Sequence, residues 1–160
     1  MGKVLSTFPN GYPGAISRST DNVIISMKNA SGTNIPFGVP VFLVPGENAC
    51  RAFDAETATP ETFLGFTVRA ADKTPDTYGS NQAVYGPGDP VEVLVRGSTV
   101  LYFEYAANVG ASVYVRKSDG KVVTSAGSEG TTVALPGVTV RTIRDSARCA
   151  EVVLTKRNIM

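Results

Sequence analysis

From residue 21 onward, short runs of apolar residues recur along the chain, separated by glycine, proline and polar residues. The run at 22–28 alternates, which places Val23, Ile25 and Met27 on one face of a strand. Further runs follow with turn signals at intervals of roughly 8–12 residues, a spacing typical of sandwiches and barrels. The pattern predicts an all-β fold, either a single-domain β-barrel or a jelly-roll-like sandwich.

Two runs also predict how a strand is buried. The run "VPVFLV" is apolar at every position, which indicates a strand covered on both faces. The run at 63–69 alternates, so Leu64, Phe66 and Val68 are expected on one side. Gly65 interrupts this strand and is expected to mark a β-bulge.

The stretch at 85–105 predicts a β-hairpin. Gly97 and Ser98 separate its two strand-like segments and are expected to form the turn. The side chains expected to face the core are Val91, Val93, Val95, Leu101 and Phe103. Those expected to face outward are Glu92, Arg96, Tyr102 and Glu104, and Arg96, Tyr102 and Glu104 are candidate contacts for a partner.

A second hairpin is predicted within "SVYVRKSDGKVVTS". Asp119 and Gly120 form the dipeptide that favours a two-residue turn, in which both central residues take positive φ. The segments at 137–144 and 150–156 complete the series of strands.

Residues 1–20 differ from the rest, because their proline and glycine residues oppose both helix and regular strand. We expect an irregular N-terminal arm over 1–20 and a β-barrel or sandwich domain over 21–160. The arm's apolar residues fit two alternatives, packing onto its own domain or docking on a neighbouring subunit. The residues expected to contact a partner from this arm are Phe8, Tyr12, Pro13, Ile16 and Arg18.

The composition excludes several functions. The net charge of +1 gives no electrostatic footprint for nucleic acid. No apolar run is long enough to cross a membrane or to form a secretory signal. Cys50 and Cys149 are therefore expected to be reduced, small apolar residues, and a disulfide between them stays open as the alternative.

Histidine is absent from the sequence, which removes Ser-His-Asp and Cys-His nucleophile activation and the usual transition-metal ligands. The acidic residues lie mainly in polar loops, where solvation explains them. A Ser-Lys dyad stays open, but no sequence context singles out a nucleophile. We expect no catalytic residue, no cofactor and no metal site.

Basic residues gather in the last third of the chain, where Arg141 and Arg144 are candidates for outward contacts. Alternation turns Arg141 away from the apolar positions Val138 and Val140. A solvated outer face, a contact with an acidic protein surface and a contact with RNA all fit this pattern.

The order of the strands resembles the bacteriophage structural cement, or capsid decoration, proteins over about residues 35–157. In that family a "G-D-x-V-x-V" strand precedes "G…V-Y-V" and a late "A-E-V-x-L" strand. The matching pieces here are "FGVPVFLV", "FLGFTVRA", "YGPGDPVEVLVRGSTVLYF", "NVGASVYVRKSDGKVV", "ALPGVTV" and "AEVVLTKRN".

This resemblance implies a compact β-barrel that forms a homotrimer and binds at junctions between major capsid subunits. The expected location is the outer surface of the virion capsid, after synthesis in the cytoplasm of a bacterial host. The resemblance implies neither catalysis nor a cofactor. The alternative is a phage tail or receptor-binding β module that recognises host carbohydrate, although the absence of tryptophan removes the best sugar-stacking side chain.

Overall fold

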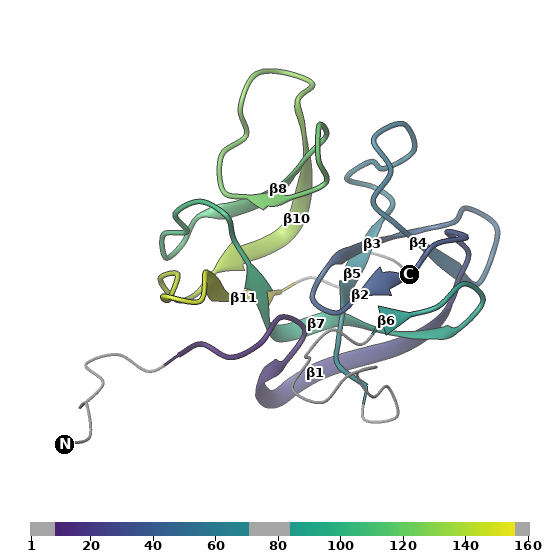
Figure 1. The fold of residues 1–160 in the computed structure, drawn as a ribbon, viewed down its shortest axis with the longest axis horizontal. Helices are drawn as coiled ribbons and strands as arrows, with labels where there is room; N and C mark the ends of the chain where they lie inside the picture. Colours follow the sequence, from purple (N-terminus) through teal and green to yellow (C-terminus); the bar gives the residue numbers. More distant parts are fainter. Residues whose placement is uncertain (1–8, 71–83, 156–160) are drawn as a thin grey trace.

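The computed structural model describes residues 9–70 and 84–155, and within these ranges the chain is built from eleven strands (Figure 1). The strands are β1 (Ile16–Asn29), β2 (Ile35–Pro36), β3 (Pro40–Leu43), β4 (Ala49–Ala52), β5 (Phe63–Thr67), β6 (Val84–Tyr85), β7 (Pro90–Tyr102), β8 (Ser112–Arg116), β9 (Val122–Val123), β10 (Thr132–Val140) and β11 (Cys149–Leu154). The described residues contain no helix capable of spanning a membrane. The predicted all-β fold is confirmed.

Five strands close into a barrel. Strand β1 pairs with β4 in parallel, and β4–β3, β3–β5, β5–β7 and β7–β1 are antiparallel, so the last pairing completes the ring. A closed ring leaves few free strand edges, which protects the barrel from edge-to-edge association. Strands β2 and β6 form a separate small sheet.

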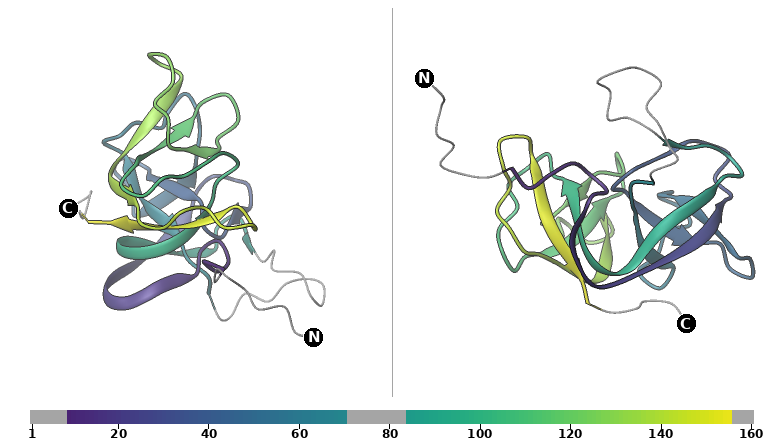
Figure 2. Two further views of the ribbon diagram at one scale, coloured as in Figure 1. Left: turned by 90° about the vertical axis from the view of Figure 1, so that its left-hand side faces the viewer. Right: turned by 90° about the horizontal axis from the view of Figure 1, so that it is seen from below.

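Strand β7 joins the barrel to the remaining strands. Along one edge it pairs with β1, while its other edge pairs with β5 at Leu94 and with β11 at Ser98. From β11 the sheet continues through β10 and β8 to β9. The right-hand view of Figure 2 shows β1 and β7 side by side across the molecule.

The predicted turn at Gly97 and Ser98 is wrong, because both residues lie inside the continuous strand β7. Gly97 has a φ of 125°, and a Cβ atom there would lie 2.1 Å from Oδ1 of Asn22 on β1. The glycine therefore permits a close approach between two strands rather than a reversal of the chain. The five side chains predicted to share one core-facing side are all buried, but they lie in two different apolar cores: Val91, Val93 and Val95 in one, Leu101 and Phe103 in the other.

Two apolar cores lie on opposite sides of the barrel wall. Val41 of β3 belongs to the core inside the barrel, and its neighbour Phe42 belongs to a second core under β8, β10 and β11. In the second core, Phe63 packs edge-to-face against Phe42 and Phe66, with ring centroids 5.9 Å and 5.4 Å apart. The wall is therefore covered on both faces, which confirms the prediction from "VPVFLV".

The predicted bulge in β5 is confirmed, but it changes which way the side chains point. The β3–β5 register shifts beside Gly65, so one additional residue of β5 faces β3. As a result Leu64 faces the barrel interior while Phe66 faces the second core. The expectation that Leu64 and Phe66 share a face is therefore wrong.

The hairpin near Asp119 is confirmed, and its turn differs from the expected one. Strands β8 and β9 pair, and the chain reverses through the four residues 117–120. Only Gly120 of the expected dipeptide has a positive φ, of 69°. Asp119 instead accepts a hydrogen bond at 3.0 Å from Nε of Arg116, which stabilises the longer loop.

The predicted boundary between residues 20 and 21 falls within β1, which begins at Ile16. The irregular conformation expected for the arm is therefore confined, among the described residues, to 9–15. The proline and glycine residues that oppose a regular strand all precede Ile16, which explains where β1 begins.

Candidate interface: the loop end and the arginine groove

Residues 9–15 cross over strand β7 and are hydrogen-bonded to it. The amide of Gly14 donates to the carbonyl of Val100 at 2.9 Å, and the amide of Val100 donates to the carbonyl of Ala15 at 3.1 Å. The hydroxyl of Thr99 donates to the same Ala15 carbonyl at 2.9 Å. The segment thus satisfies backbone groups that β7 would otherwise leave unpaired.

On one side of β7, Asn10 fixes this segment to the loop between β10 and β11. Its amide donates to Oδ2 of Asp145 at 2.7 Å, and its side-chain Nδ2 donates to the carbonyls of Ile143 and Cys149 at 2.9 Å and 2.8 Å. Asp145 also accepts from the amide of Cys149 at 2.9 Å. Asn10 was not predicted as a contact residue, because Asn-Gly signals only a local turn, whereas the partners of Asn10 are distant in the sequence.

On the other side, two glycines bring the segment against the barrel. Gly14 and Gly38 have φ values of 81° and 71°, and a Cβ atom on Gly38 would lie 2.5 Å from the amide nitrogen of Gly14. The guanidinium of Arg69 lies over the ring of Tyr12 at 5.3 Å, and its Nε donates to the carbonyl of Pro13 at 3.2 Å. These contacts favour the alternative in which the segment packs onto its own domain.

The residues predicted to contact a partner from the arm differ in how much surface they expose. Tyr12 is 60% exposed and Ile16 36%, whereas Pro13 is half-buried. Arg18 is exposed and belongs to a groove described below. Phe8 lies outside the described residues.

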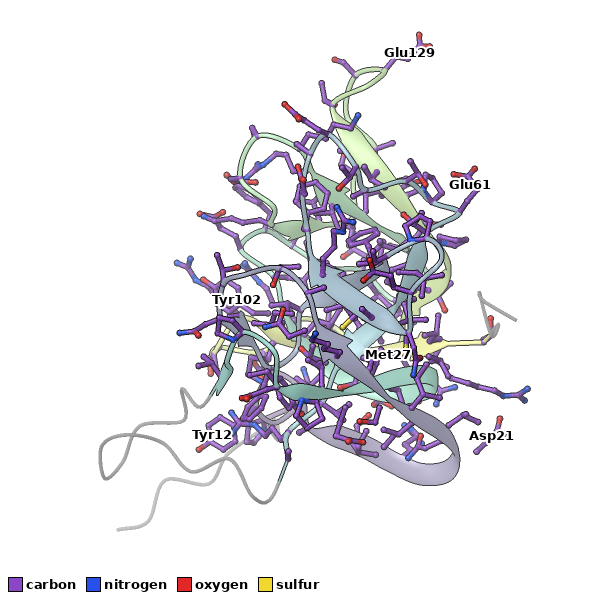
Figure 3. The ribbon with its side chains drawn as sticks, turned by 90° about the vertical axis from the view of Figure 1, so that its right-hand side faces the viewer. Tyr12, Asp21, Met27, Glu61, Tyr102 and Glu129 are labelled. Carbon is purple, nitrogen blue, oxygen red and sulfur yellow. The ribbon has the colours of Figure 1, made fainter. Side chains whose placement is uncertain are left out.

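Three segments meet at one end of the molecule, which we call the loop end: residues 9–15, 102–111 and 141–148. Arg144 joins two of them, since its Nη1 donates to the carbonyl of Phe103 at 3.2 Å and to that of Glu104. In Figure 1 the segments lie together on the left, and in Figure 3 Tyr12 and Tyr102 occupy the same flank. The exposed apolar side chains here are Tyr12 (60%), Tyr102 (45%), Tyr105 (56%), Val109 (64%) and Ile143 (68%).

Two predicted outward residues of the loop end make internal contacts. Arg144 is half-buried against the backbone, and half-buried Glu104 accepts a hydrogen bond from Nζ of Lys121 at 2.7 Å. Arg116 lies 3.6 Å from the same carboxylate and also binds Asp119, lowering the pKa of Asp119 to about 2. These polar residues therefore fix the β8–β9 hairpin to the end of β7.

A groove of about 320 Å³ lies over the middle of β7, and we call it the arginine groove. Gly97, which has no side chain, and Ser98, which has a small one, line this groove and leave its space open. It includes two predicted outward residues, Arg96 and Arg141, and the predicted arm residue Arg18. The lining residues are Arg18, Asp21, Arg96, Gly97, Ser98, Arg141, Val153, Leu154 and Thr155.

Ion pairs hold the arginines of this groove in place. Arg18 Nε donates to Oε1 of Glu151 at 2.7 Å, and Nη1 of Arg141 lies 3.8 Å from the same oxygen. Hydrogen bonding to Glu151 raises the pKa of Arg18 above its ordinary value. Arg96 donates to Oδ2 of Asp21 from Nε at 3.0 Å and from Nη2 at 2.8 Å.

Glu151, which is only 7% exposed on β11, was not among the predicted site residues. One signal was present: a single acid within the apolar strand "AEVVL". A charge buried in a strand requires a partner of opposite sign, so this position indicates a distant cation. The sequence alone does not identify that cation as Arg18.

The two thiols are not suited to nucleophilic chemistry. Burial inside the barrel raises the pKa of Cys50 to about 11, and burial together with the charge of Asp145 raises the pKa of Cys149. Both cysteines are unpaired. Across 9–70 and 84–155, no three His, Cys, Asp or Glu residues are grouped so that they could hold a metal ion.

The described residues form a β-barrel with an exposed apolar end and an arginine-lined groove, surfaces of the kind through which structural and binding proteins contact their partners. The chain matches the family described as "Structural cement protein (E217 gp24/Pam3 gp6)" over residues 3–155. It therefore belongs to the phage structural cement proteins, as its strand order indicated. This membership implies a virion component that is associated with the capsid and has a structural rather than enzymatic role.

A chain from "The capsid of Myoviridae Phage XM1" is similar at 19% identity and a TM-score of 0.71, with 96% of each chain covered. At this identity the likeness confirms the fold alone. The head fiber gp8.5 N base of bacteriophage phi29 aligns at 12% identity and a TM-score of 0.43, covering 86% of this chain and 99% of that one. No match was found among curated proteins.

Proposed function

We propose that this chain binds the outside of an assembled phage head and bridges neighbouring major capsid subunits. The match to the structural cement family over residues 3–155 carries this proposal. The partners are the major capsid protein and further copies of this chain in a homotrimer, with no nucleic acid. The loop end supports the proposal, because exposed apolar side chains on a soluble domain commonly mark a protein-binding surface.

Bridging would stabilise a shell by linkage. A protein that binds the assembled shell and not the free subunits lowers the free energy of the assembled state alone. At a ligand concentration of about 100 Kd, each occupied site contributes about 2.7 kcal/mol. A trimer adds multivalency, so three modest contacts give tight attachment when the geometry permits them to form together.

The loop end is suited to such a contact because hydrogen bonds fix its loops before any partner binds. Asn10 and Arg144 connect all three of its segments through backbone carbonyls and Asp145. Exposed side chains on a preorganised surface lose less conformational entropy on binding than those on free loops. We therefore assign Tyr102, Val109 and Ile143 to the contact with the shell.

Co-sedimentation with assembled shells that lack this chain tests the proposal. The wild-type chain is expected to pellet saturably with shells and to stay in solution with unassembled capsid protein. Ile143→Asp is expected to weaken pelleting at least about tenfold, because it places a charge within an apolar contact. Ile24→Asp is the matched control, since Ile24 is 42% exposed on β1, outside the loop end.

Sedimentation velocity of the free chain tests the homotrimer separately. A trimer is expected for the wild type and for both variants. A monomeric Ile143→Asp variant would reassign the loop end to contacts between copies. A wild-type chain that never pellets with shells would refute the proposed function.

A further inference from the structure

We infer that the arginine groove binds a carboxylate on an acidic segment of the protein partner. This inference rests on the proposed function and identifies the chemistry of one contact. The groove is distinct from the loop end, because it lies over Gly97 and Ser98 in the middle of β7. Its walls come from β1, β7, the end of β10 and the end of β11.

The arginines have donors that internal contacts do not use. Nε of Arg18 binds Glu151, which leaves both terminal nitrogens of Arg18 without a partner in the described part of the chain. Arg96 uses Nε and Nη2 for Asp21, so its Nη1 remains available. The side chains of Arg18, Arg96 and Arg141 are 56%, 46% and 40% exposed, so a ligand can reach all three.

The charges in the groove favour an anion. Three guanidinium groups are balanced by only two carboxylates, those of Asp21 and Glu151, so one positive charge remains. Glu151 lies beneath the arginines, since its side chain is 9% exposed, so a ligand that enters the groove meets the guanidinium groups before it meets this carboxylate. Guanidinium groups bind carboxylates through two parallel hydrogen bonds, a geometry that a fixed arginine offers without further ordering.

The groove fits a protein carboxylate better than nucleic acid. A nucleic-acid backbone presents a row of phosphates and is bound by a stripe of basic residues, with acids excluded. Here two acids interrupt the arginines, and the whole chain has 15 basic and 14 acidic residues. A single localised positive site matches one acidic side chain on a protein surface.

Internal contacts also hold the guanidinium groups of Arg18 and Arg141 in position before a ligand binds. Glu151 holds Arg18 from one side, and Arg141 is positioned by Ser98 Oγ at 3.4 Å and by the backbone bond from its own amide to the Glu151 carbonyl at 2.8 Å. Because Gly97 and Ser98 are small, the space beside the guanidinium groups stays open. A larger side chain at Ser98 would fill that space.

Titration of the full chain with hexaglutamate peptide, followed through the arginine Nε–Hε resonances by NMR, tests the inference directly. The expected result is a saturable shift of the groove arginines that 0.5 M NaCl weakens, as for any exposed ion pair. Arg96→Gln/Arg141→Gln is expected to lower the affinity at least about tenfold. The control Lys28→Gln/Arg148→Gln removes the same charge from two exposed positions outside the groove and is expected to bind within about twofold of wild type.

Three results would overturn the inference: no shift of the groove arginines, equal affinity in the groove variant and the control, or tighter binding of a short oligothymidylate. The shell assay separates this inference from the proposed function. If wild type and groove variant pellet equally well with shells, the proposed function holds and the groove inference fails. If wild type does not pellet, the proposed function fails and the peptide titration still decides the groove.

Discussion

Replacing Gly38 with alanine tests whether residues 9–15 belong to the fold of the barrel itself. Gly38 has a φ of 71°, and an added Cβ would lie 2.5 Å from the amide nitrogen of Gly14 and 2.7 Å from Cβ of Pro13. Both distances are shorter than van der Waals contact, so the segment must move. That movement would also weaken the hydrogen bond from Gly14 to Val100.

The expected loss in the free energy of unfolding has two parts. Holding a non-glycine residue in the left-handed region costs roughly 1–2 kcal/mol. Overpacking a well-packed contact costs roughly 1–3 kcal/mol more. Gly38→Ala is therefore expected to lower the free energy of unfolding by about 2–5 kcal/mol, a large share of the 5–15 kcal/mol typical of a domain.

Gly46→Ala is the matched control. Gly46 has a φ of 80°, and an added Cβ there would meet nothing within 4 Å, so only the conformational cost of roughly 1–2 kcal/mol applies. Urea denaturation of both variants gives the difference between them, provided that the slope of the transition is unchanged. Equal losses for Gly38→Ala and Gly46→Ala would refute the packing of residues 9–15 against the barrel.

Three further predictions concern the barrel wall, the buried thiol and the hairpin. Gly65→Ala is expected to prevent folding, because its Cβ would lie 2.0 Å from the carbonyl oxygen of Leu94; circular dichroism and the yield of soluble protein check this, and a normally folded variant would contradict it. Because the folded-state pKa of Cys50 is raised to about 11, its stabilising contribution is present at neutral pH and is lost as the pH rises toward that value. In a Cys149→Ser variant, which leaves one thiol, Cys50 is expected to resist Ellman's reagent at pH 8 in the folded chain and to react in urea; rapid labelling of this variant without urea would show that the barrel is open. Because Arg116 lowers the pKa of Asp119 to about 2, the stabilising contribution of Asp119 is present above its ordinary value of 3.8 and is lost as the pH falls toward 2. An NMR titration of the Asp119 carboxyl group measures this midpoint, and a value near 3.8 would show that the ion pair is absent in solution.

The local patterns predicted the strands and their buried faces well. Val91, Val93 and Val95 alternate toward a core, and the structure buries them inside the barrel. The continuous apolar run around Phe42 correctly indicated a strand covered on both faces, because one face packs inside the barrel and the other against the second core. Short-range alternation is sufficient for such predictions, since each strand has a period of two.

The predictions were wrong at residues whose conformation depends on contact with a strand that is distant in the sequence. Gly97 has the local signature of a turn, but its lack of a side chain accommodates Asn22 of β1 within a continuous strand. At Gly65, the bulge reverses the alternation, so that Leu64 and Phe66 enter different cores. The residue type at these positions can be read from one sequence, but which strand packs against the residue cannot.

The candidate surfaces were predicted only in part, again because contacts between distant strands determine them. Arg96 and Arg141 were expected to face outward, and the structure brings them together with Arg18 in one groove. Their proximity depends on the pairing of β1 and β11 with opposite edges of β7, which no local pattern encodes. The buried acid Glu151 was overlooked because its cation is distant in the sequence.

Reconstitution of shells with the purified chain tests the central claim most directly. Shells assembled without the chain would be heated alone and with a saturating amount of it, while their disassembly is followed by light scattering. A chain that bridges capsid subunits is expected to raise the disassembly temperature, to occupy the outer surface in electron micrographs, and to leave the stability of free capsid protein unchanged. An unchanged disassembly temperature at saturating occupancy would contradict the cementing role.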